Sequence, residues 1–252
     1  MPYVGLSMMS IRPPRISRLP TPHLEPLNAR DVVVGDVIEA SLIADTDLGG
    51  VDFGDVSLTT CSVVRTSLDD ADLTGVRVVD SRFDEVSSAR VFAPRSMLHN
   101  VRIENSRIGA LDLFGGKMRS VIISDCKLGL VNLSGNEARD VIFRSCVIDE
   151  LDVSEATLTR VAFDDTTVAS LDVHRATLTD VDLRDLRVNN VRNLGGLAGA
   201  VDAGARGVGM TRAGTIRVAL LVGAVAAQSA IWASARVWDQ QLGFSHIWRL
   251  NW

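Results

Sequence analysis

The sequence predicts a solenoid built from stacked repeats, and three observations lead to this fold class. The chain repeats in units of five from Asp31 to Asn190 without an inserted or deleted residue. The third residue of nearly every five is apolar, and similar fives recur every 20 residues. A helix needs an apolar period of about 3.6 residues and a strand a period of about 2, so neither explains the pattern, whereas stacked repeats do.

The third residue of each five is expected to form the core. This position holds large aliphatic or aromatic side chains through most of the repeat. We expect Ile123 to lie in one stack with Ile103 and Phe143, because the three residues are 20 apart. The first residue of each five is mostly small or β-branched, as in Cys126 and Ala156, and is expected to point inward as well.

Four consecutive fives are expected to make one coil. The openings of four successive coils resemble one another: Leu111-Asp112-Leu113, Val131-Asn132-Leu133, Leu151-Asp152-Val153 and Leu171-Asp172-Val173. With ~4.8 Å between neighbouring strand layers, eight coils form a rod about 38 Å long. Because each coil buries its apolar residues only against its neighbours, both ends of such a rod need caps.

Two fives identify the repeat type. Ala71-Asp72-Leu73-Thr74-Gly75 resembles the consensus of the pentapeptide-repeat family, and Val131-Asn132-Leu133-Ser134-Gly135 is close to it. The resemblance covers Asp31 to Asn190, and the lack of loops within the repeats makes the chain similar to actinobacterial members of the family. This resemblance implies an all-β, right-handed quadrilateral β-solenoid of about eight coils, with one five on each side.

One coil is expected to be less well packed than the others. Ser88 and Ala93 replace large aliphatic residues at consecutive inward positions, and Pro94 follows directly. Lost side-chain volume leaves either a cavity or a local collapse. We therefore predict under-packing or a bend in this coil.

The segments outside the repeat differ from it in composition and charge. Residues 31–190 carry a net charge of −12, whereas the remainder carries +7. Residues 1–30 hold six of the seven prolines and four arginines. They are expected to form an extended arm over the first coil, with a nucleic-acid-binding arm as the alternative. Residues 191–214 form a glycine-rich connector, and residues 215–252 an apolar tail that is expected to be helical.

The tail leaves several interpretations open. Residues 218–235 carry no charge and would span about 27 Å as a helix, slightly less than the ~30 Å hydrocarbon core of a membrane. All four tryptophans lie in this tail. The leading hypothesis is a helical cap or a homodimer contact. Membrane association through residues 218–235 is an alternative, and the abrupt change in composition also fits a shift of the reading frame.

The sequence predicts no catalytic site, no metal site and no cofactor, and hence no enzyme activity. The four histidines are scattered, and no set of ligands clusters around any of them. Residues 204–211 superficially match a phosphate-binding loop, but Met210 stands where that loop needs a lysine. Cys61, Cys126 and Cys146 are expected to be buried and reduced, and without a secretory signal a cytoplasmic location is expected.

Two sets of outward residues are candidate partner-binding sites. An acidic column is predicted, and a second one two sides away: Asp52, Asp72, Asp112, Asp152 and Asp172 form the first, and Asp45, Glu85, Asp125, Asp165 and Asp185 the second. Apolar residues also point outward, namely Ile122 and Ile142 in one column, Val147 on the next side, and Phe92 with Phe114 on another. Exposed apolar groups of this kind can mark protein contacts, unless the arm or the tail covers them.

These features favour a non-catalytic protein-binding rod or scaffold. The acidic columns resemble those of pentapeptide proteins of the quinolone-resistance type, which imitate DNA and bind DNA gyrase, so a DNA mimic is the main alternative. The net charge of −12 is about half the charge density of B-DNA over the same length. Aspartate could also serve only to keep the rod soluble. A membrane-attached scaffold is a third interpretation, and the acidic solenoid itself is not expected to bind nucleic acid.

Overall fold

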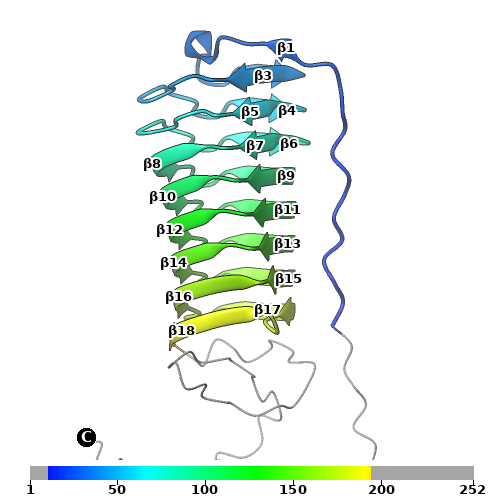
Figure 1. The fold of residues 1–252 in the computed structure, drawn as a ribbon, viewed down its shortest axis with the longest axis vertical. Coiled ribbons are helices and arrows are strands. Elements are labelled where there is room, and N and C mark those ends of the chain that lie inside the picture. Colours follow the sequence, from blue (N-terminus) through cyan, green and yellow to red (C-terminus); the bar gives the residue numbers. More distant parts are fainter. Residues whose placement is uncertain (1–10, 194–252) are drawn as a thin grey trace, which may run out of the picture. The chain divides into compact units, whose positions relative to one another are not determined.

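The computed structural model describes residues 11–193, which form a parallel β-solenoid and an extended N-terminal arm (Figure 1). This confirms the predicted all-β fold of about eight coils. Residues 194–252, which include nearly all of the predicted connector and the whole predicted tail, lie outside the described residues. No helix among the described residues has the length and apolar character needed to cross a membrane.

The described residues contain 18 strands and one 3-10 helix. In chain order they are β1 (Glu25–Pro26), η1 (Ala29–Asp31), β2 (Val37–Glu39), β3 (Ser41–Ala44), β4 (Ser57–Thr59), β5 (Ser62–Val64), β6 (Arg77–Val79), β7 (Arg82–Asp84), β8 (Ser87–Phe92), β9 (Met97–Glu104), β10 (Arg107–Asp112), β11 (Lys117–Ser124), β12 (Lys127–Asn132), β13 (Glu137–Arg144), β14 (Val147–Asp152), β15 (Thr157–Asp164), β16 (Thr166–Asp172), β17 (Thr177–Asp182) and β18 (Leu186–Arg192).

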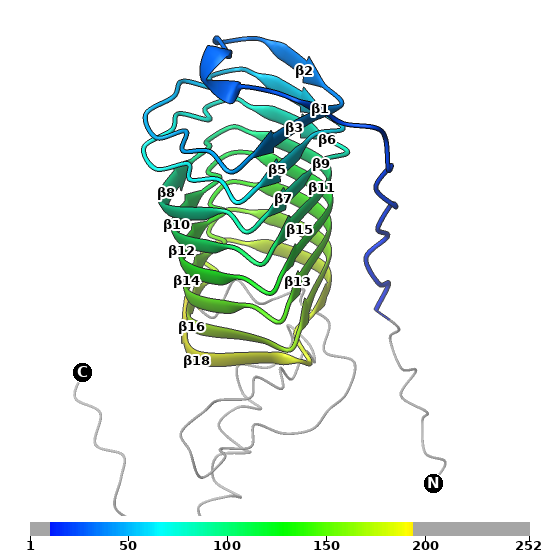
Figure 2. The same cartoon turned by 45° about the horizontal axis from the view of Figure 1, so that its top comes forward.

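Within the repeat, every paired strand matches residues that are 20 apart, and all these pairs are parallel. The register therefore stacks each side of the rod into its own column of strands (Figure 2). We name the four faces after one coil: face 1 is residues 96–100, face 2 is 101–105, face 3 is 106–110 and face 4 is 111–115. Each face also includes the equivalent residues at intervals of 20.

The core consists of the inward stacks that the sequence predicts. Ile123 pairs with Ile103 on one side and with Phe143 on the other, which confirms the predicted stack. The rings of Phe143 and Phe163 stack with centroids 5.1 Å apart. First-position residues such as Ala156 are fully buried as well. The apolar faces of single coils thus join into one continuous core.

The corners of the rod need left-handed backbone, and the fifth residue of most fives supplies it. Asp140 has φ 59° and Asn105 has φ 50°, and short polar residues tolerate this region better than others. The corner between faces 3 and 4 changes along the rod. Asp70 has φ 58°, whereas β8 and the later strands of face 3 continue through this corner without a positive φ.

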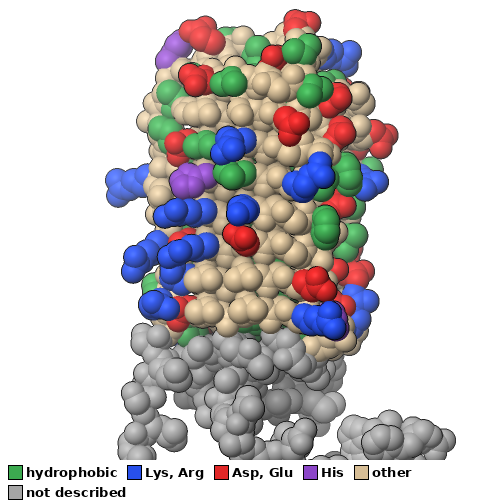
Figure 3. Space-filling model, turned by 180° about the vertical axis from the view of Figure 1, so that it is seen from behind, with side chains coloured by type: hydrophobic (Ala, Val, Ile, Leu, Met, Phe, Trp, Pro, Cys, Tyr) green, Lys and Arg blue, Asp and Glu red, His purple; other side chains and the backbone are tan. Residues whose placement is uncertain are grey.

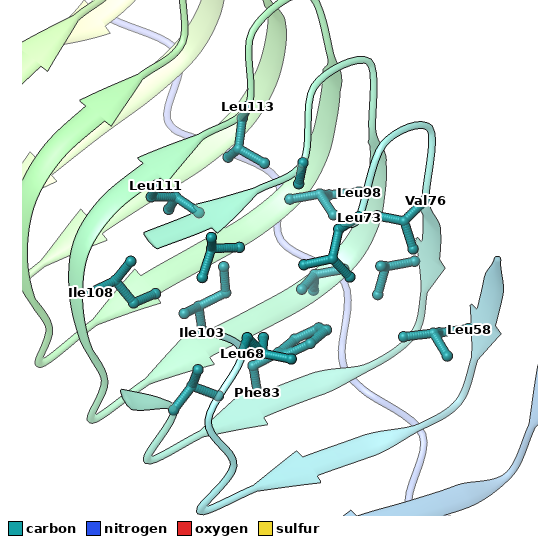
Figure 4. A pocket seen from close by; sticks show the side chains of 15 residues that line it. Leu58, Leu68, Leu73, Val76, Phe83, Leu98, Ile103, Ile108, Leu111 and Leu113 are labelled. Carbon is teal, nitrogen blue, oxygen red and sulfur yellow. The ribbon is translucent and has the colours of Figure 1, made fainter. Parts of the chain in front are cut away.

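The coil in which this corner changes contains a cavity. Its volume is about 60 Å³, and apolar side chains including Leu73, Phe83, Ala93 and Leu113 line it (Figure 4). This finding confirms the predicted under-packing around Ala93. Ser88 is buried nearby, but its hydroxyl donates a hydrogen bond of 2.9 Å to a carboxylate oxygen of Asp69.

The N-terminal arm follows the long axis of the rod. Strand β1 adds to the first coil by pairing with β3, and η1 lies next to it at the same end. Residues 11–24 then extend along the outside of the coils toward β17, as Figures 1 and 2 show. The arm was expected to lie over the first coil, but its described contacts reach most of the solenoid. Its extended backbone agrees with its proline content.

Candidate functional site

The acidic column lies on face 4, and the register links its members. Asp52 pairs with Asp72, Asp112 with Asn132, and Asp152 with Asp172. Two positions of the same column are not acidic, because Phe92 follows Asp72 and Asn132 separates Asp112 from Asp152. The structure therefore brings the five predicted carboxylates onto one face, in a column that two other residues interrupt.

Each carboxylate of this column also has a local structural role that sequence reasoning missed. Its Oδ1 accepts a hydrogen bond from the N–H two residues later: 2.8 Å at Asp52, 2.8 Å at Asp72, 3.3 Å at Asp112, 2.8 Å at Asp152 and 3.0 Å at Asp172. Asn132 does the same at 3.0 Å. These are Asx turns, which both aspartate and asparagine form. The presence of Asn132 in the column was the available sequence signal.

Hydrogen bonds lower the pKa of two members of the acidic column, Asp72 and Asp172. Those from Thr74 lower the pKa of Asp72. At Asp172, the hydrogen bond from the Asn193 side chain lowers the pKa, and the His174 N–H and the charges of Arg192 and His174 add to this effect. Arg192 Nε lies 3.6 Å from an Asp172 carboxylate oxygen. Part of the negative charge on face 4 is thus already balanced within the rod.

The second predicted acidic column, at the corner between faces 2 and 3, is also interrupted. Arg65 occupies the position after Asp45 and holds it in a two-pronged ion pair of 2.6 and 2.7 Å. That pair lowers the pKa of the Asp45 carboxyl, mainly through the Arg65 hydrogen bond. Asp165 likewise contacts Arg187 at 2.5 Å. Glu85, Asp125 and Asp185 are exposed members of this column.

The five predicted apolar contact residues lie on three faces. Ile122 and Ile142 pair with each other on face 2 and are half-buried. Val147 lies on face 3 and is 49% exposed. Phe92 and Phe114 lie on face 4, where Phe114 is 52% exposed. Face 4 therefore carries both the acidic column and the most exposed aromatic side chain of the described residues.

Phe92 is part of a small mixed cluster on face 4. The guanidinium of Arg90 lies over its ring, 4.7 Å from the centroid, which is a cation–π geometry. Arg90 also lies 3.8 Å from an Asp112 carboxylate oxygen. The nearby Leu130 is an exposed apolar residue at the corner between faces 3 and 4, and sequence reasoning did not single it out.

Face 1 carries a local cluster of basic side chains. A groove of about 580 Å³ crosses β9, β11, β13 and β15, and its lining includes His99, Lys117, Arg119 and Arg139. Blue side chains gather on this side of the rod in Figure 3. Two of these cations have acidic neighbours, since Lys117 lies 3.3 Å from Glu137 and Arg139 lies 3.7 Å from Asp140. Sequence reasoning missed this basic cluster because the net charge of the repeat is negative.

The cysteines are buried and free, as predicted. The hydrogen bond with Cys146, together with burial, raises the pKa of the Cys126 thiol. Burial likewise raises the pKa of Cys61. Protonated, covered thiols of this kind are poor nucleophiles. Among residues 11–193, no three metal-ligating side chains gather into a possible metal site.

The strict 20-residue register, with one five on each side of every coil, decides the architecture. The chain is a parallel β-solenoid of five-residue repeats. Two solved structures of pentapeptide-repeat proteins are similar to this solenoid. One is HetL, a protein involved in heterocyst differentiation regulation in the cyanobacterium Nostoc, with 14% identity, a TM-score of 0.24, and coverage of 61% of this chain and 89% of HetL.

The other is QnrB1, a plasmid-mediated fluoroquinolone resistance protein. Its full-length structure has 12% identity, a TM-score of 0.29, and coverage of 59% of this chain and 86% of QnrB1. At these scores neither likeness carries an inference about the partner or activity of this solenoid. No protein-family model and no curated protein matches the chain.

Proposed function

We propose that the solenoid is a non-catalytic protein-binding rod that contacts its partner through face 4. The observation that carries this proposal is the common location of the aromatic residues and the acidic column. Phe92 stands within the column itself, between Asp72 and Asp112, and Phe114 lies on the same face. An apolar centre framed by charged residues is the usual composition of a protein interface.

The chemistry of face 4 describes the partner. Exposed Phe114 fits an apolar pocket, and buried aromatic anchors carry much of the energy in protein interfaces. The surrounding carboxylates favour lysine and arginine on the partner around that pocket, and complementary charge raises the rate of association. The strand ladders hold the backbone of this face in place, so little order has to be gained on binding.

A DNA mimic that binds DNA gyrase or another DNA-binding protein is the second candidate. The carboxylates of face 4 that favour it stand in register, with ~4.8 Å between successive coils. The interruptions at Phe92 and Asn132 and the ion pair of Asp172 lower its charge density. The two candidate functions differ in whether the carboxylates or the aromatic rings of face 4 contribute more to partner binding.

Two sets of variants separate the candidates. The triple change Asp112→Asn, Asp152→Asn and Asp172→Asn removes three charges and keeps the Asx turns, because Asn132 forms the same turn naturally. The double change Phe92→Ser and Phe114→Ser removes the aromatic anchors. Val147→Ser is the matched control, since it removes an exposed apolar residue from face 3.

Partner capture from the native host is measured with each variant. For a scaffold, the Phe92 and Phe114 double variant loses the partner, whereas the Val147 variant and the triple variant retain most of it. For a DNA mimic, the wild type inhibits gyrase supercoiling, and the triple variant does not. That inhibition weakens with salt, because charges are screened within about 10 Å at 0.1 M. Equal capture by the double variant and the wild type would contradict the scaffold proposal.

A further inference from the structure

The described part of the arm, residues 11–24, lies along one corner of the rod. The corner between faces 1 and 2 holds a column of polar residues with very low exposure: 2% at Asn100, 4% at Ser120, 4% at Asp140, 5% at Arg160 and 9% at Asp180. We call this column the arm corner. Fifth residues at other corners, such as Asn105, Asp125 and Arg95, are exposed. The arm is therefore what separates the arm corner from the solvent.

The arm corner is an organised polar surface. Arg160 holds Asp140 in a two-pronged ion pair with both distances 2.6 Å. Burial alone would raise the pKa of the Asp140 carboxyl, but hydrogen bonds from Arg160 and from the arm, together with the charges of Arg160 and Arg139, lower it overall. An ionised carboxylate with further acceptor capacity thus faces the arm.

The arm corner binds mainly the main chain of the arm. The Arg15 N–H donates to Asp140 at 2.8 Å, and the Ser17 N–H donates to the Ser120 hydroxyl at 2.9 Å. The Asn100 amide donates to the Arg18 carbonyl at 3.1 Å. Two further contacts complete the set, one from Arg102 to the Ser17 carbonyl and one from the Arg12 N–H to Asp180.

The spacing of these contacts follows from two repeat lengths. A polyproline helix has three residues per turn and rises ~9.3 Å per turn. Two coils of the solenoid rise about 9.6 Å. Accordingly Arg12 contacts Asp180, Arg15 contacts Asp140 two coils away, and the Arg18 carbonyl contacts Asn100 after two more coils. An extended chain of this pitch therefore stays in register with the arm corner.

The arm sequence matches these demands. Pro13 and Pro14 lack an N–H, and they stand between two residues whose N–H groups are used. The side chains of Arg12, Arg15 and Arg18 recur every three residues, so a polyproline helix places them along one side, and all three residues are exposed. Only the Arg12 guanidinium makes a described ion pair with the solenoid, at 2.7 Å from Asp180.

We propose that the arm corner is a peptide-binding groove for an extended, proline-containing segment, which the arm fills in cis and a partner protein's segment fills in trans. Because the groove forms hydrogen bonds with main-chain N–H and C=O groups, it can bind any extended segment that has free N–H groups at the matching positions. The arm is then an internal competitor, present at an effective concentration of about 1 mM through its tether.

A partner's segment is a better occupant than the arm of a second copy. An exchanged arm makes the same contacts as the cis arm, so exchange adds no interaction within the groove and loses the advantage of the tether. A foreign segment can make additional contacts with the exposed basic side chains on face 1, for example through acidic residues beside its prolines. The groove on face 1, lined by Arg119 and Arg139, lies next to the arm corner.

The test uses the full chain and a fluorescent peptide of residues 11–24, followed by anisotropy. Arg15→Pro in the chain removes the N–H that Asp140 binds, and so loosens the cis arm without changing the groove. Arg18→Pro is the matched control, because it removes the same charge and adds the same ring, whereas the contact of Arg18 uses its carbonyl. We expect the Arg15→Pro chain to bind the wild-type peptide about tenfold more tightly than the wild-type chain, with Arg18→Pro within about twofold of the wild type.

Three results would overturn the proposal. The first is equal peptide binding by the Arg15→Pro and Arg18→Pro chains. The second is no binding by a folded chain whose arm has been cut at a protease site inserted between Pro22 and His23, with peptide present up to about 1 mM. Circular dichroism checks that each chain is folded, and the cut chain serves if Arg15→Pro does not fold. The third is an arm-dependent dimer in light scattering, which would assign the groove to a second copy.

Discussion

The rod carries two rows of aspartates, and they have opposite surroundings. The arm corner contains Asp140 and Asp180, which are buried under the arm, whereas the acidic column on face 4 contains Asp152 and Asp172, which lie at the surface. Both rows recur with the 20-residue period of the coil. Asp140 and Asp180 are the fifth residue of their five, whereas Asp152 and Asp172 are the second, so the two rows differ in repeat position as well as in what lies over them.

This contrast shows how one repeat supports two kinds of polar surface. Carboxylates on face 4 satisfy one oxygen with their own turn and leave the side chain available to a partner. Asp140 instead combines an ion pair with Arg160 and a hydrogen bond from the arm. A buried ion pair contributes little beyond its desolvation cost when intact, but breaking it leaves a buried charge. The same substitution should therefore have unequal effects in the two rows.

The largest expected effect comes from Ile123→Asp, because Ile123 belongs to the core of the coils that carry both rows. Ile123 is fully buried between Ile103 and Phe143, so the variant buries an unpaired charge between coils. We expect a loss of more than about 4 kcal/mol in the free energy of unfolding, and hence an unfolded rod. Circular dichroism measures this, with the surface variant Val147→Asp as the control. A folded Ile123→Asp rod with unchanged melting would show that the register is wrong.

Asp140→Ala should give the next largest effect and makes the contrast between the rows quantitative. It leaves Arg160 buried without its partner, and we expect a destabilisation of about 3 kcal/mol, the lower end of the range for a broken buried pair. Chemical denaturation measures the free energy of unfolding, and protease cleavage within residues 11–24 reports release of the arm. A loss as small as that of a face 4 variant would mean that the arm does not bury this corner in solution.

The same carboxylate predicts a dependence on pH. The pKa of Asp140 is lower in the folded chain than its ordinary value, so its contribution is fully present above about pH 4. That contribution is lost as the pH falls below about 4 toward the folded pKa, since protonation weakens the Arg160 pair. Arm release, measured by cleavage with an acid-active protease, should therefore rise below about pH 4 in the wild type. The Asp140→Asn variant should show a smaller rise over the same range.

Ala93→Val should change stability in the opposite direction without touching either row. The added methyl groups fill part of the 60 Å³ cavity, whose cost is about 1.4 kcal/mol if each Å³ costs ~24 cal/mol. We expect a gain of up to about 1 kcal/mol, seen as a melting temperature higher by about 2–4 °C. Arm cleavage should stay unchanged. A lower melting temperature would indicate that the cavity collapses and that the larger side chain overpacks the coil.

The smallest effect is expected from Asp152→Asn on face 4. Asparagine keeps the Asx turn, as Asn132 shows one coil away, so stability should change by less than about 0.5 kcal/mol. Asp152→Ala removes the turn and should cost more than the asparagine variant. Thermal melts of the two variants compare these effects. If asparagine cost as much as alanine, the charge rather than the turn would stabilise this coil.

Much of the fold could be predicted because a period of five within a period of 20 restricts the chain to one register. Every inward stack, including that of Ile123, follows from the register, as does the burial of the cysteines. The cavity near Ala93 could also be predicted, because a small side chain at an inward position leaves part of the core unfilled. The candidate residues on face 4 were placed correctly on one side, but their Asx turns were not foreseen.

The sequence by itself thus determined which residues face inward, how the coils stack and which residues share a column. Only the tertiary structure decided which columns are covered. The path of residues 11–24 depends on main-chain hydrogen bonds to Ser120, Asp140 and Asn100, which lie more than 80 residues away along the chain. Main-chain groups are the same at every residue except proline, so no side-chain pattern identifies the surface they will bind. The burial of the arm corner, and the groove proposed there, therefore became visible only when the arm and the rod were seen together.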